Sequence, residues 1–352
     1  MFRTRRSSIG IDVDGRNVNA VQLTQSRNHL RIEAAISVPR ADSTIPLDED
    51  EVRRVTDILY RQGFRGRDVV LALPNEAVMS SILKVPSNGD QSELSQAARN
   101  QLAKAHHCDP QALEIASWDV PAHGGATAGK HVMAMACRSE LANAAIDIFE
   151  GAGLTVRAID VRLCALARAC GRLSPWSDGV AALLNVGWSF AELALVRGGV
   201  LVFERTLVDS SLSQLHASLQ STYDIDAQIT DRLIAEVGCE TVAANANADA
   251  RSDLASAVHN QIVRYVDRLV TELKASISFA TQEYAQGHVE RIFVTGEEAA
   301  LAGLVPRISA ELGVEGRSVA PTDIADVTAT ISKQGASPLL TVAVGLASHP
   351  DG

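Results

Sequence analysis

The sequence predicts an α/β protein made of two related halves with a ligand-binding cleft between them. Residues 8–38 and residues 180–207 each have the pattern of three short apolar strands separated by polar turns. The turn glycines of the two stretches, Gly15 and Gly187, are 187 − 15 = 172 residues apart. A unit repeated once at that separation suits a chain of 352 residues, and related units commonly bind ligands where they meet.

The first strand ends on a carboxylate beside a tight turn. Asp14-Gly15 is a strong hairpin signal because glycine adopts positive φ without a steric cost. Free backbone N–H groups in such a turn can hold a phosphate, and Asp12 can hold a divalent cation through water. The second stretch repeats the arrangement with Asn185 and Gly187. Taken alone, the first motif also fits an ordinary N-terminal hairpin, and the second copy is what favours a ligand site.

The composition argues against broad nucleic-acid binding and against a membrane span. The formal net charge is −10, which would repel a phosphate backbone. A short basic cluster of Arg3, Arg5 and Arg6 fits a solvated tail or a contact with acidic lipid. No run of about 18 apolar residues occurs, and no apolar core follows the N-terminal charges. The five cysteines lack CxxC spacing, so we expect reduced thiols in a cytosolic protein.

Between the two stretches, the apolar spacing changes from helix to strand several times. Residues 52–62 have helical spacing and stop at Gly63, and residues 69–73 form a continuous apolar run that fits a strand buried on both faces. After Pro74 the composition changes, and the following segments predict a small inserted β-α-β-β-α unit. The remaining expected elements are a strand over 78–85, a helix over 93–105, strands over 113–120 and 131–137 around a flexible tip at 123–129, a helix over 139–152 capped by Ser139, a strand over 155–161 and a helix over 163–169.

The sequence predicts more helix in the second half of the chain than in the first. We expect two helices after its three strands, then a loose Ala- and Asn-rich segment, a long helix, a strand, a helix that stops at Gly313 and a short closing helix. In order, these segments span residues 212–222, 227–237, 239–252, 254–284, 289–294, 299–312 and 339–347.

These patterns also predict where domains begin and end. The expected divisions are a first domain over 1–74, an inserted α+β subdomain over 75–157, a return to the first domain over 158–179, a second domain over 180–224 and 289–338 with a helical subdomain at 225–288, and a closing helix and tail over 339–352.

A series of short motifs runs in the same order as in a known family. Gly10-Ile11-Asp12 resembles that family's first phosphate loop, and Leu184-Asn185-Val186-Gly187 resembles its second. Further matches are Leu83-Lys84-Val85-Pro86, Gly151-Ala152-Gly153-Leu154, Ala158-Ile159-Asp160, Ile292-Phe293-Val294-Thr295-Gly296 and Val342-Ala343-Val344-Gly345-Leu346-Ala347. The chain therefore resembles PilM, the actin-like family of type IV pilus assembly that is related to the division protein FtsA.

The resemblance implies an actin-like fold, with two ribonuclease-H-like domains, an inserted small α+β subdomain, and ATP with Mg²⁺ between the domains. The implied nucleotide-site residues are Asp12, Gly15, Arg16, Asn17, Asn19, Asn185, Gly187, Trp188, Gly296 and Glu297, with Asp12 as a metal contact through water. It also implies a cytoplasmic protein, peripheral on the inner membrane through its partners. Those partners are a PilN-like bitopic inner-membrane protein, other pilus or secretion assembly proteins, and further copies of the chain. The PilN-like partner would insert a short N-terminal peptide into a groove that involves the inserted subdomain.

Several positions depart from the family's pattern at the nucleotide contacts. They are Asp14 and Asn19 in the first loop, Asn185 and Trp188 in the second, and Asp231 and Glu297 on the nucleoside side. A carboxylate at Asp14 would face the triphosphate, and like charges about 4 Å apart repel by about 4 kcal/mol at an effective dielectric of 20. Arg16 could offset that charge, or Asp14 could turn away. Asn19 and Asn185 replace a lysine and an aspartate of the family, which removes two charges.

We therefore predict a degenerate member of the family that binds ATP weakly or not at all, has no catalytic residue and acts as an assembly scaffold. The second interpretation is an active switch of the same fold, with partner binding or polymerisation controlled by nucleotide. The third is a sugar-kinase-like phosphotransferase, which needs a catalytic Asp over a substrate hydroxyl; neither Asp160 nor Asp178 has suitable neighbours in the sequence.

Overall fold

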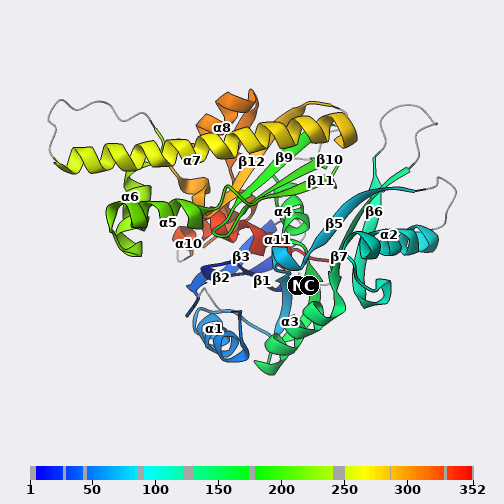
Figure 1. The fold of residues 1–352 in the computed structure, drawn as a ribbon. Coiled ribbons are helices and arrows are strands. Elements are labelled where there is room, and N and C mark those ends of the chain that lie inside the picture. The colour runs from blue at the N-terminus through cyan, green and yellow to red at the C-terminus, as the bar shows by residue number, and fades with distance from the viewer. Residues whose placement is uncertain are drawn as a thin grey trace.

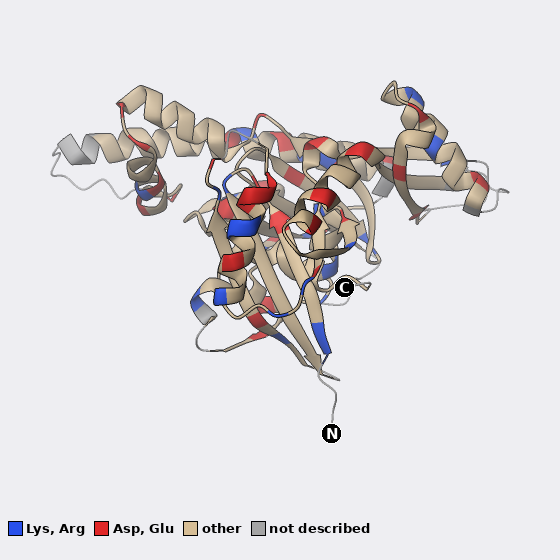
Figure 2. Ribbon diagram, turned by 90° about the horizontal axis from the view of Figure 1, so that it is seen from below, with Lys and Arg blue, Asp and Glu red and all other residues tan. Residues whose placement is uncertain are grey.

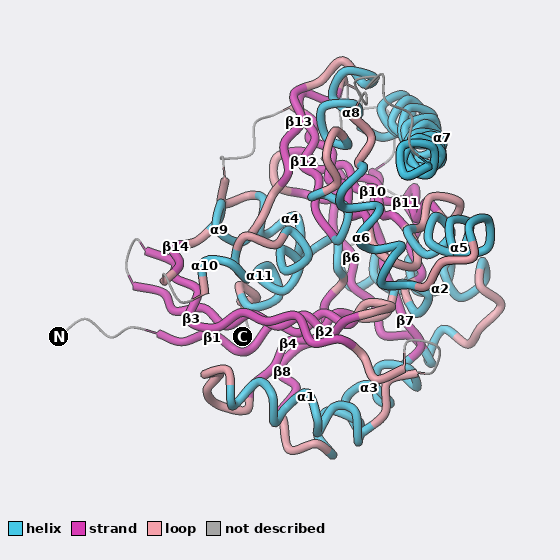
Figure 3. Tube along the Cα trace, turned by 90° about the vertical axis from the view of Figure 1, so that its left-hand side faces the viewer, coloured by secondary structure: helices cyan, strands magenta, loops and turns pink. Residues whose placement is uncertain are grey.

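The computed structural model describes residues 5–26, 29–42, 46–85, 91–121, 130–173, 179–240, 250–285, 287–328 and 331–350. Within these ranges the backbone forms three sheets. Two of the sheets face each other across a central layer of helices, and further helices cover their outer faces, as the two views in Figures 1 and 3 show. The chain is therefore stacked as five alternating layers, with the third sheet at one side.

The first sheet has the strand order β14-β3-β2-β1-β4-β8. Its strands are β14 (Asp326–Val327), β3 (His29–Pro39), β2 (Asn17–Ser26), β1 (Arg5–Val13), β4 (Asp68–Ala72) and β8 (Thr155–Asp160). The first three strands in sequence are antiparallel, whereas β4 and β8 run parallel to β1. Helices α1 (Glu49–Arg61) and α3 (Ser139–Gly151) cover the outer face (Figure 1).

The second sheet repeats this plan with the strand order β11-β10-β9-β12-β13. Its strands are β9 (Val180–Val186), β10 (Ala191–Arg197), β11 (Val200–Leu207), β12 (Val289–Gly296) and β13 (Glu315–Ser318). Again three antiparallel strands are followed by two parallel ones. The long helix α7 (Ala250–Ala280) and α8 (Leu304–Leu312) cover its outer face (Figure 1). The duplication predicted from the two strand patterns is confirmed.

The central layer consists of α4 (Arg162–Cys170) and α11 (Thr341–Ala347), and it needs glycine to fit. A Cβ atom on Gly10 of β1 would lie 2.2 Å from the carbonyl oxygen of Ala343 in α11. A Cβ atom on Gly345 would lie 1.9 Å from the carbonyl oxygen of Ala165 in α4. Both distances are far below van der Waals contact, so any side chain at either glycine would force strand and helices apart.

The third sheet, β5-β7-β6, belongs to an inserted unit beside the second sheet. We use "inserted unit" for β5 (Met79–Val85), α2 (Gln91–Ala105), β6 (Leu113–Val120), β7 (Lys130–Arg138) and the 3-10 turn Asn75–Ala77. Although it interrupts the first half in sequence, Val120 and Met133 share a hydrophobic core with the second sheet. The Trp118 indole N–H also donates to the Leu201 carbonyl oxygen of β11 at 2.8 Å. The inserted unit therefore connects the two halves.

Some predicted elements differ in the structure. The helix expected over 299–312 is two pieces, a 3-10 turn at Glu297–Ala300 and α8, because Gly303 has a φ of 84° and caps α8 in a left-handed conformation. Ser139 does not cap α3. Arg138 holds the N-cap position, and the Ser139 hydroxyl donates instead to Glu114.

Other segments were predicted incompletely. Helix α7 begins at Ala250, inside the segment expected to be loose, and residues 241–249 of that segment lie outside the described residues, as does the predicted tip at 123–129. Helices α5 (Leu212–Tyr223) and α6 (Ala227–Val237) match the expected pair closely. Short elements that were not predicted are α9 (Pro321–Ile324), α10 (Ser332–Gly335), β13 and β14. The domain boundaries proposed from the sequence stay a prediction.

Charged residues of both signs are scattered over the described part of the fold (Figure 2). Lys and Arg segments alternate with Asp and Glu segments across the described ribbon (Figure 2). Among the described helices, none is both long enough and apolar enough to cross a bilayer.

Candidate functional site

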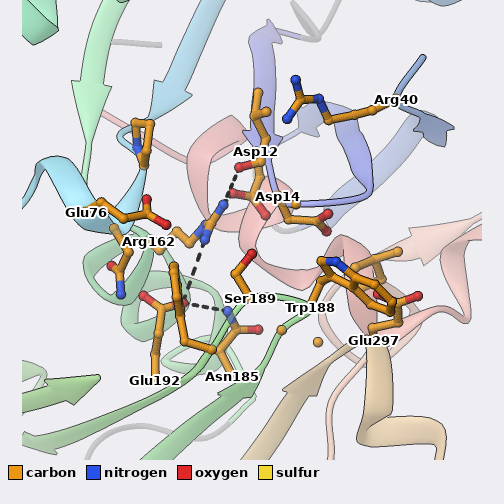
Figure 4. A pocket seen from close by; sticks show the side chains of 18 of the residues that line it. Asp12, Asp14, Arg40, Glu76, Arg162, Asn185, Trp188, Ser189, Glu192 and Glu297 are labelled. Atoms are coloured by element: carbon orange, nitrogen blue, oxygen red, sulfur yellow. Dashed lines mark hydrogen bonds and ion pairs between the residues drawn. The ribbon is translucent and has the colours of Figure 1, made fainter. Parts of the chain in front are cut away.

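A cleft of about 450 Å³ opens where the two sheets face each other, at the ends of β1, β9 and β12 (Figure 4). Its lining includes seven of the residues predicted from the sequence: Asp12, Gly15, Asn185, Gly187, Trp188, Gly296 and Glu297. Arg16 and Asn17 lie just outside it, on a second cavity that also contacts Glu297. Asn19 is buried under the first turn. The two related strand patterns thus place their turns on opposite sides of one cleft.

The charge at the floor of the cleft is set by Arg162, a residue that the sequence did not indicate. Arg162 and Asp12 are both more than nine-tenths buried, and the guanidinium Nε donates to Asp12 Oδ1 at 2.6 Å. The same guanidinium donates to the carbonyl oxygen of Val13 and lies 4.0 Å from Glu192 Oε2. An internal cation therefore neutralises the carboxylate that the sequence assigned to a metal contact.

Glu192 is the second buried carboxylate of this cluster. Asn185 Nδ2 donates to its Oε2 at 2.8 Å, while Oε1 has no hydrogen-bond partner. Burial raises the pKa of Glu192 to about 7, against the attraction of Arg162. The polar side chain of Asn185 is thus engaged by Glu192 and points along the cleft floor (Figure 4).

Asp14 folds back into its own turn. Its Oδ1 accepts hydrogen bonds from the backbone N–H groups of Arg16 at 2.7 Å and Asn17 at 2.8 Å. Its Oδ2 accepts a third hydrogen bond from Asn19 Nδ2 at 3.1 Å. Burial, and next the nearby charge of Asp12, raise the pKa of Asp14. The side chain therefore occupies two of the N–H groups that a phosphate would use.

The two turns also touch each other directly. A Cβ atom on Gly15 would lie 2.6 Å from Trp188 Cδ1 and 2.7 Å from Ser189 Oγ. The turn that carries Trp188 is closed by a hydrogen bond from Gly187 N–H to the Phe190 carbonyl oxygen at 3.1 Å. The ring of Trp188 thus fills space between the two halves at the point where both turns meet the cleft.

Arg16 reaches from the first turn into the second half. Its two Nη atoms donate to the two carboxylate oxygens of Asp231 in α6 at 2.9 and 2.8 Å. Nη1 also lies 3.4 Å from Glu297 Oε1, and the guanidinium carbon lies 4.3 Å from the Trp188 ring centroid. The hydrogen bonds from Arg16 lower the pKa of Asp231, whereas burial raises the pKa of Glu297 to about 7.

His216 of α5 contacts both Trp188 and Asp231, the partners of Arg16. Its ring lies edge-on to the Trp188 ring, with 4.8 Å between centroids, and its Nε2 lies 3.4 Å from Asp231 Oδ1. Burial lowers the pKa of His216 to about 4, so the ring is neutral at physiological pH. The Nδ1 atom has no hydrogen-bond partner, which leaves Nε2 as the atom that can carry the proton toward Asp231.

Beyond Arg16 the cleft continues into a second cavity of about 390 Å³. Apolar residues Leu212, Ile234 and Leu301 contribute to its wall, beside Asp231 and Glu297. Gly296, which lines the first cleft, has a φ of 95°, and a Cβ atom there would lie 2.4 Å from the Val186 carbonyl oxygen. The glycine is required because β12 ends directly against β9.

A third hollow, of about 610 Å³, is a groove between the inserted unit and the central layer. It is lined by Trp118, Asp119, Cys164, Ala167, Arg168, Gly171, Arg172, Gly199, Val200 and Leu201. Arg168 is fixed by Asp160, 2.8 Å away, and by the Gly345 carbonyl oxygen at 2.7 Å. The groove therefore has α4 on one side and the ends of β6 and β11 on the other.

Comparison with known families identifies the chain. The family model described as type IV pilus assembly protein PilM matches residues 10–349. The chain belongs to the PilM family. Both this membership and the actin-like fold that was predicted from the motifs are confirmed.

Solved structures with the same fold include distant relatives. A "PilM-PilN type IV pilus biogenesis complex" contains a chain that is 22% identical to this chain, with a TM-score of 0.79 and 97% of each chain covered. The ethanolamine utilization protein EutJ from Carboxydothermus hydrogenoformans is 13% identical, with a TM-score of 0.53 over 97% of this chain and 89% of EutJ. At these identities the likeness concerns the fold alone.

The site thus contains predicted and unpredicted residues. The structure brings the ten predicted residues to the cleft or its borders, but it pairs several of their polar side chains with residues outside that set: Asp12 with Arg162, Asn185 with Glu192, Asn19 with Asp14 and Arg16 with Asp231. Sequence reasoning missed Arg162, Glu192 and His216. Glu192 carried a usable signal, because it interrupts an apolar strand seven residues after Asn185 (192 − 185 = 7), as Asn19 follows Asp12 (19 − 12 = 7).

Proposed function

We propose that this protein is an assembly scaffold of a type IV pilus or type II secretion-like machine, and that it works without hydrolysing ATP. The observation that carries the proposal is the internal pairing of the cleft. Arg162 satisfies Asp12, Asp14 satisfies the N–H groups of its own turn, and Trp188 contacts the other turn. Mg²⁺ and a triphosphate fit this arrangement poorly, because Asp12, Asn185 and two N–H groups of the first turn are already bonded to other groups of the protein.

Titration with Mg²⁺-ATP tests this part of the proposal. Isothermal calorimetry on the full chain is expected to show no saturable heat at about 100 μM nucleotide. Binding with a micromolar Kd, or nucleotide carried through purification, would instead support the switch of the same fold. Released phosphate in the presence of sugars would support the kinase.

The scaffold role requires a partner, and the groove beside the inserted unit offers a place for one. The solved relative is a complex of PilM with PilN. We propose that this chain binds the cytoplasmic N-terminal peptide of a PilN-like inner-membrane protein between Trp118 and Arg172. The ends of β6 and β11 can contribute backbone hydrogen bonds, while apolar positions such as Val200 can receive peptide side chains. Such a contact would hold the protein at the inner membrane.

Two substitutions on β11 and its end give a matched test. Val200→Glu places a charge in the groove, whereas Val208→Glu places the same charge at a position that is 61% exposed and outside the groove lining. Measured by fluorescence anisotropy with a labelled N-terminal PilN peptide, V200E is expected to weaken binding at least about tenfold, because a buried charge costs more than 1.4 kcal/mol. V208E should change affinity less than about twofold. Equal affinities for both variants would place the peptide elsewhere.

A further inference from the structure

Arg16 makes specific polar contacts across the boundary between the two halves. Arg16 belongs to the turn between β1 and β2, and its partners come from three separate elements of the second half. Asp231 lies on α6, Glu297 follows β12, and Trp188 lies between β9 and β10. The sequence separations from Arg16 to Asp231 and Glu297 are 215 and 281 residues. One side chain therefore joins the first turn to three separate elements of the second half.

The two carboxylates and the ring match a guanidinium better than any other side chain. Asp231 receives a fork of two parallel hydrogen bonds, a geometry that lysine cannot provide. The guanidinium group also lies over the ring of Trp188, and such a ring attracts a cation. His216 holds both Asp231 and Trp188 in place. The pocket for the guanidinium is thus built on the second half and faces the first.

Other contacts also join the halves: Arg162 of the central layer lies 4.0 Å from Glu192, and the inserted unit packs on β11. The inserted unit bonds to β11 through Trp118 and Leu201 and through Asn75 and Thr206. Figure 1 shows the inserted unit at the end of the molecule opposite α5 and α6. Any opening of the two halves on the α6 side would have to break the contacts of Arg16 with Asp231 and Glu297.

We propose that Arg16 is a built-in latch that holds the two halves closed on the α6 side. The Arg16 side chain bridges the cleft between the two halves, as a bound ligand would otherwise do. The latch deepens the scaffold proposal, but it makes no use of the peptide groove. Closure therefore does not depend on nucleotide, and a partner would encounter one fixed arrangement of the two halves.

Hydrogen–deuterium exchange on the full chain, without nucleotide or peptide, tests the latch. Arg16→Ala and Asp231→Asn should each raise the exchange of the first turn and of α6 about three- to tenfold, since each removes the forked ion pair. Glu236→Gln is the matched control, because Glu236 is on the same helix but pairs with Arg232 within that helix at 2.7 Å. It should leave exchange of the first turn unchanged.

The double variant R16A/D231N decides whether the two residues act as one unit. The latch predicts that its exchange equals that of the stronger single variant. Additive effects, or single variants that exchange like E236Q, would overturn the proposal. Circular dichroism confirms that each variant is folded, and R16K supplies a milder change that keeps the charge and should give an intermediate effect. Peptide affinity measured in parallel keeps the outcomes separate, because loss of the latch leaves the groove intact.

Discussion

The two turns that face each other across the cleft share one backbone plan and differ in chemistry. Across the first hairpin Asp12 pairs in register with Asn19, and across the second Asn185 pairs with Glu192. The acid and the amide have exchanged strands between the copies. Arg162 lies between the two acids, 2.6 Å from one and 4.0 Å from the other. The duplicated sheet thus kept a polar pair in each copy, and one cation from the central layer serves both.

The rest of each turn differs more. The first turn is filled by its own carboxylate, Asp14, and contains Gly15. The second turn projects an aromatic ring, Trp188, against that glycine. The comparison shows that the backbone of a ligand-binding cleft can be kept while the side chains on its two sides bind to each other. The substitutions below are ordered from the largest expected effect to the smallest.

Removing the shared cation should have the largest effect. Arg162→Ala leaves Asp12 and Glu192 buried without a counter-charge, and we expect about 3–5 kcal/mol of lost stability in urea unfolding. Arg157→Ala is the control, because Arg157 and its partner Asp68 are about half exposed. It should cost less than about 1 kcal/mol. A small loss for R162A would mean that water or another group neutralises the acids.

The contact between the turns can be broken from either side. Gly15→Ala should cost about 1–3 kcal/mol because its Cβ would overlap the Trp188 ring. In a Trp188→Ala background the same change should cost clearly less, because the remaining close atom, Ser189 Oγ at 2.7 Å, can rotate away; a double-mutant cycle of thermal or urea unfolding would reveal the difference. Gly187→Ala makes a looser contact, 3.0 Å from the Phe190 carbonyl oxygen, and should cost less. If G15A costs the same with and without Trp188, the turn itself rather than the ring requires glycine.

Titration of the second copy's acid should have an effect of about 1 kcal/mol. Burial raises the pKa of Glu192 from 4.5 to about 7, so the folded state binds its proton more tightly than the unfolded state. Stability is therefore highest below about pH 4.5, falls as pH rises toward 7, and levels off once the folded state has also lost the proton. Between about pH 6 and 7, Glu192→Gln should flatten the decline by roughly 1 kcal/mol. Glu297, raised to about 7 and left in place, retains its share of the slope in this variant. A steeper decline in E192Q would contradict this assignment.

Emptying the first turn should have the smallest effect. Asp14→Ala removes three hydrogen bonds but also a buried carboxylate whose pKa is raised by desolvation. The two terms oppose each other, and we expect about 0.5–1 kcal/mol of lost stability by urea unfolding. A loss above about 2 kcal/mol would show that Asp14 organises the turn rather than merely filling it.

Much of the fold could be predicted because it depends on repeated local signals. The two strand patterns, the apolar run at 69–73 and the helix stops at Gly63 and Gly313 are local, and the structure has the corresponding elements. The break at Gly303 was missed because the apolar residues around it keep helical spacing. The sequence does not distinguish a glycine in a left-handed conformation from a glycine inside a helix. The short strand β14 depends on pairing with β3 about 300 residues earlier, which no local pattern reveals.

The position of the candidate site could be predicted from the sequence, whereas the interactions of its side chains could be predicted only in part. Strand ends and tight turns gave the positions of Asp12 and Asn185, since those follow from sequence neighbours. The partners of their side chains come from distant parts of the chain. Arg162 opens a helix 150 residues after Asp12 and has the sequence context of an ordinary helix start. Likewise, the alternatives for Asp14 could be resolved only by the position of Asn19 beneath it.

The tight seat of α11 against β1 has a consequence for how the chain acquires its structure. Gly10 and Ala343 are in contact although 343 − 10 = 333 residues separate them. During synthesis, the first strand therefore emerges long before the helix that buries one of its faces. Until that helix is made, the apolar residues Val21 and Leu23 of the neighbouring strand β2, which pack against Ala343 and Val344 of α11, stay open to water, and the first half cannot reach its final packing. We therefore expect the last step of folding to wait for the C-terminal helix.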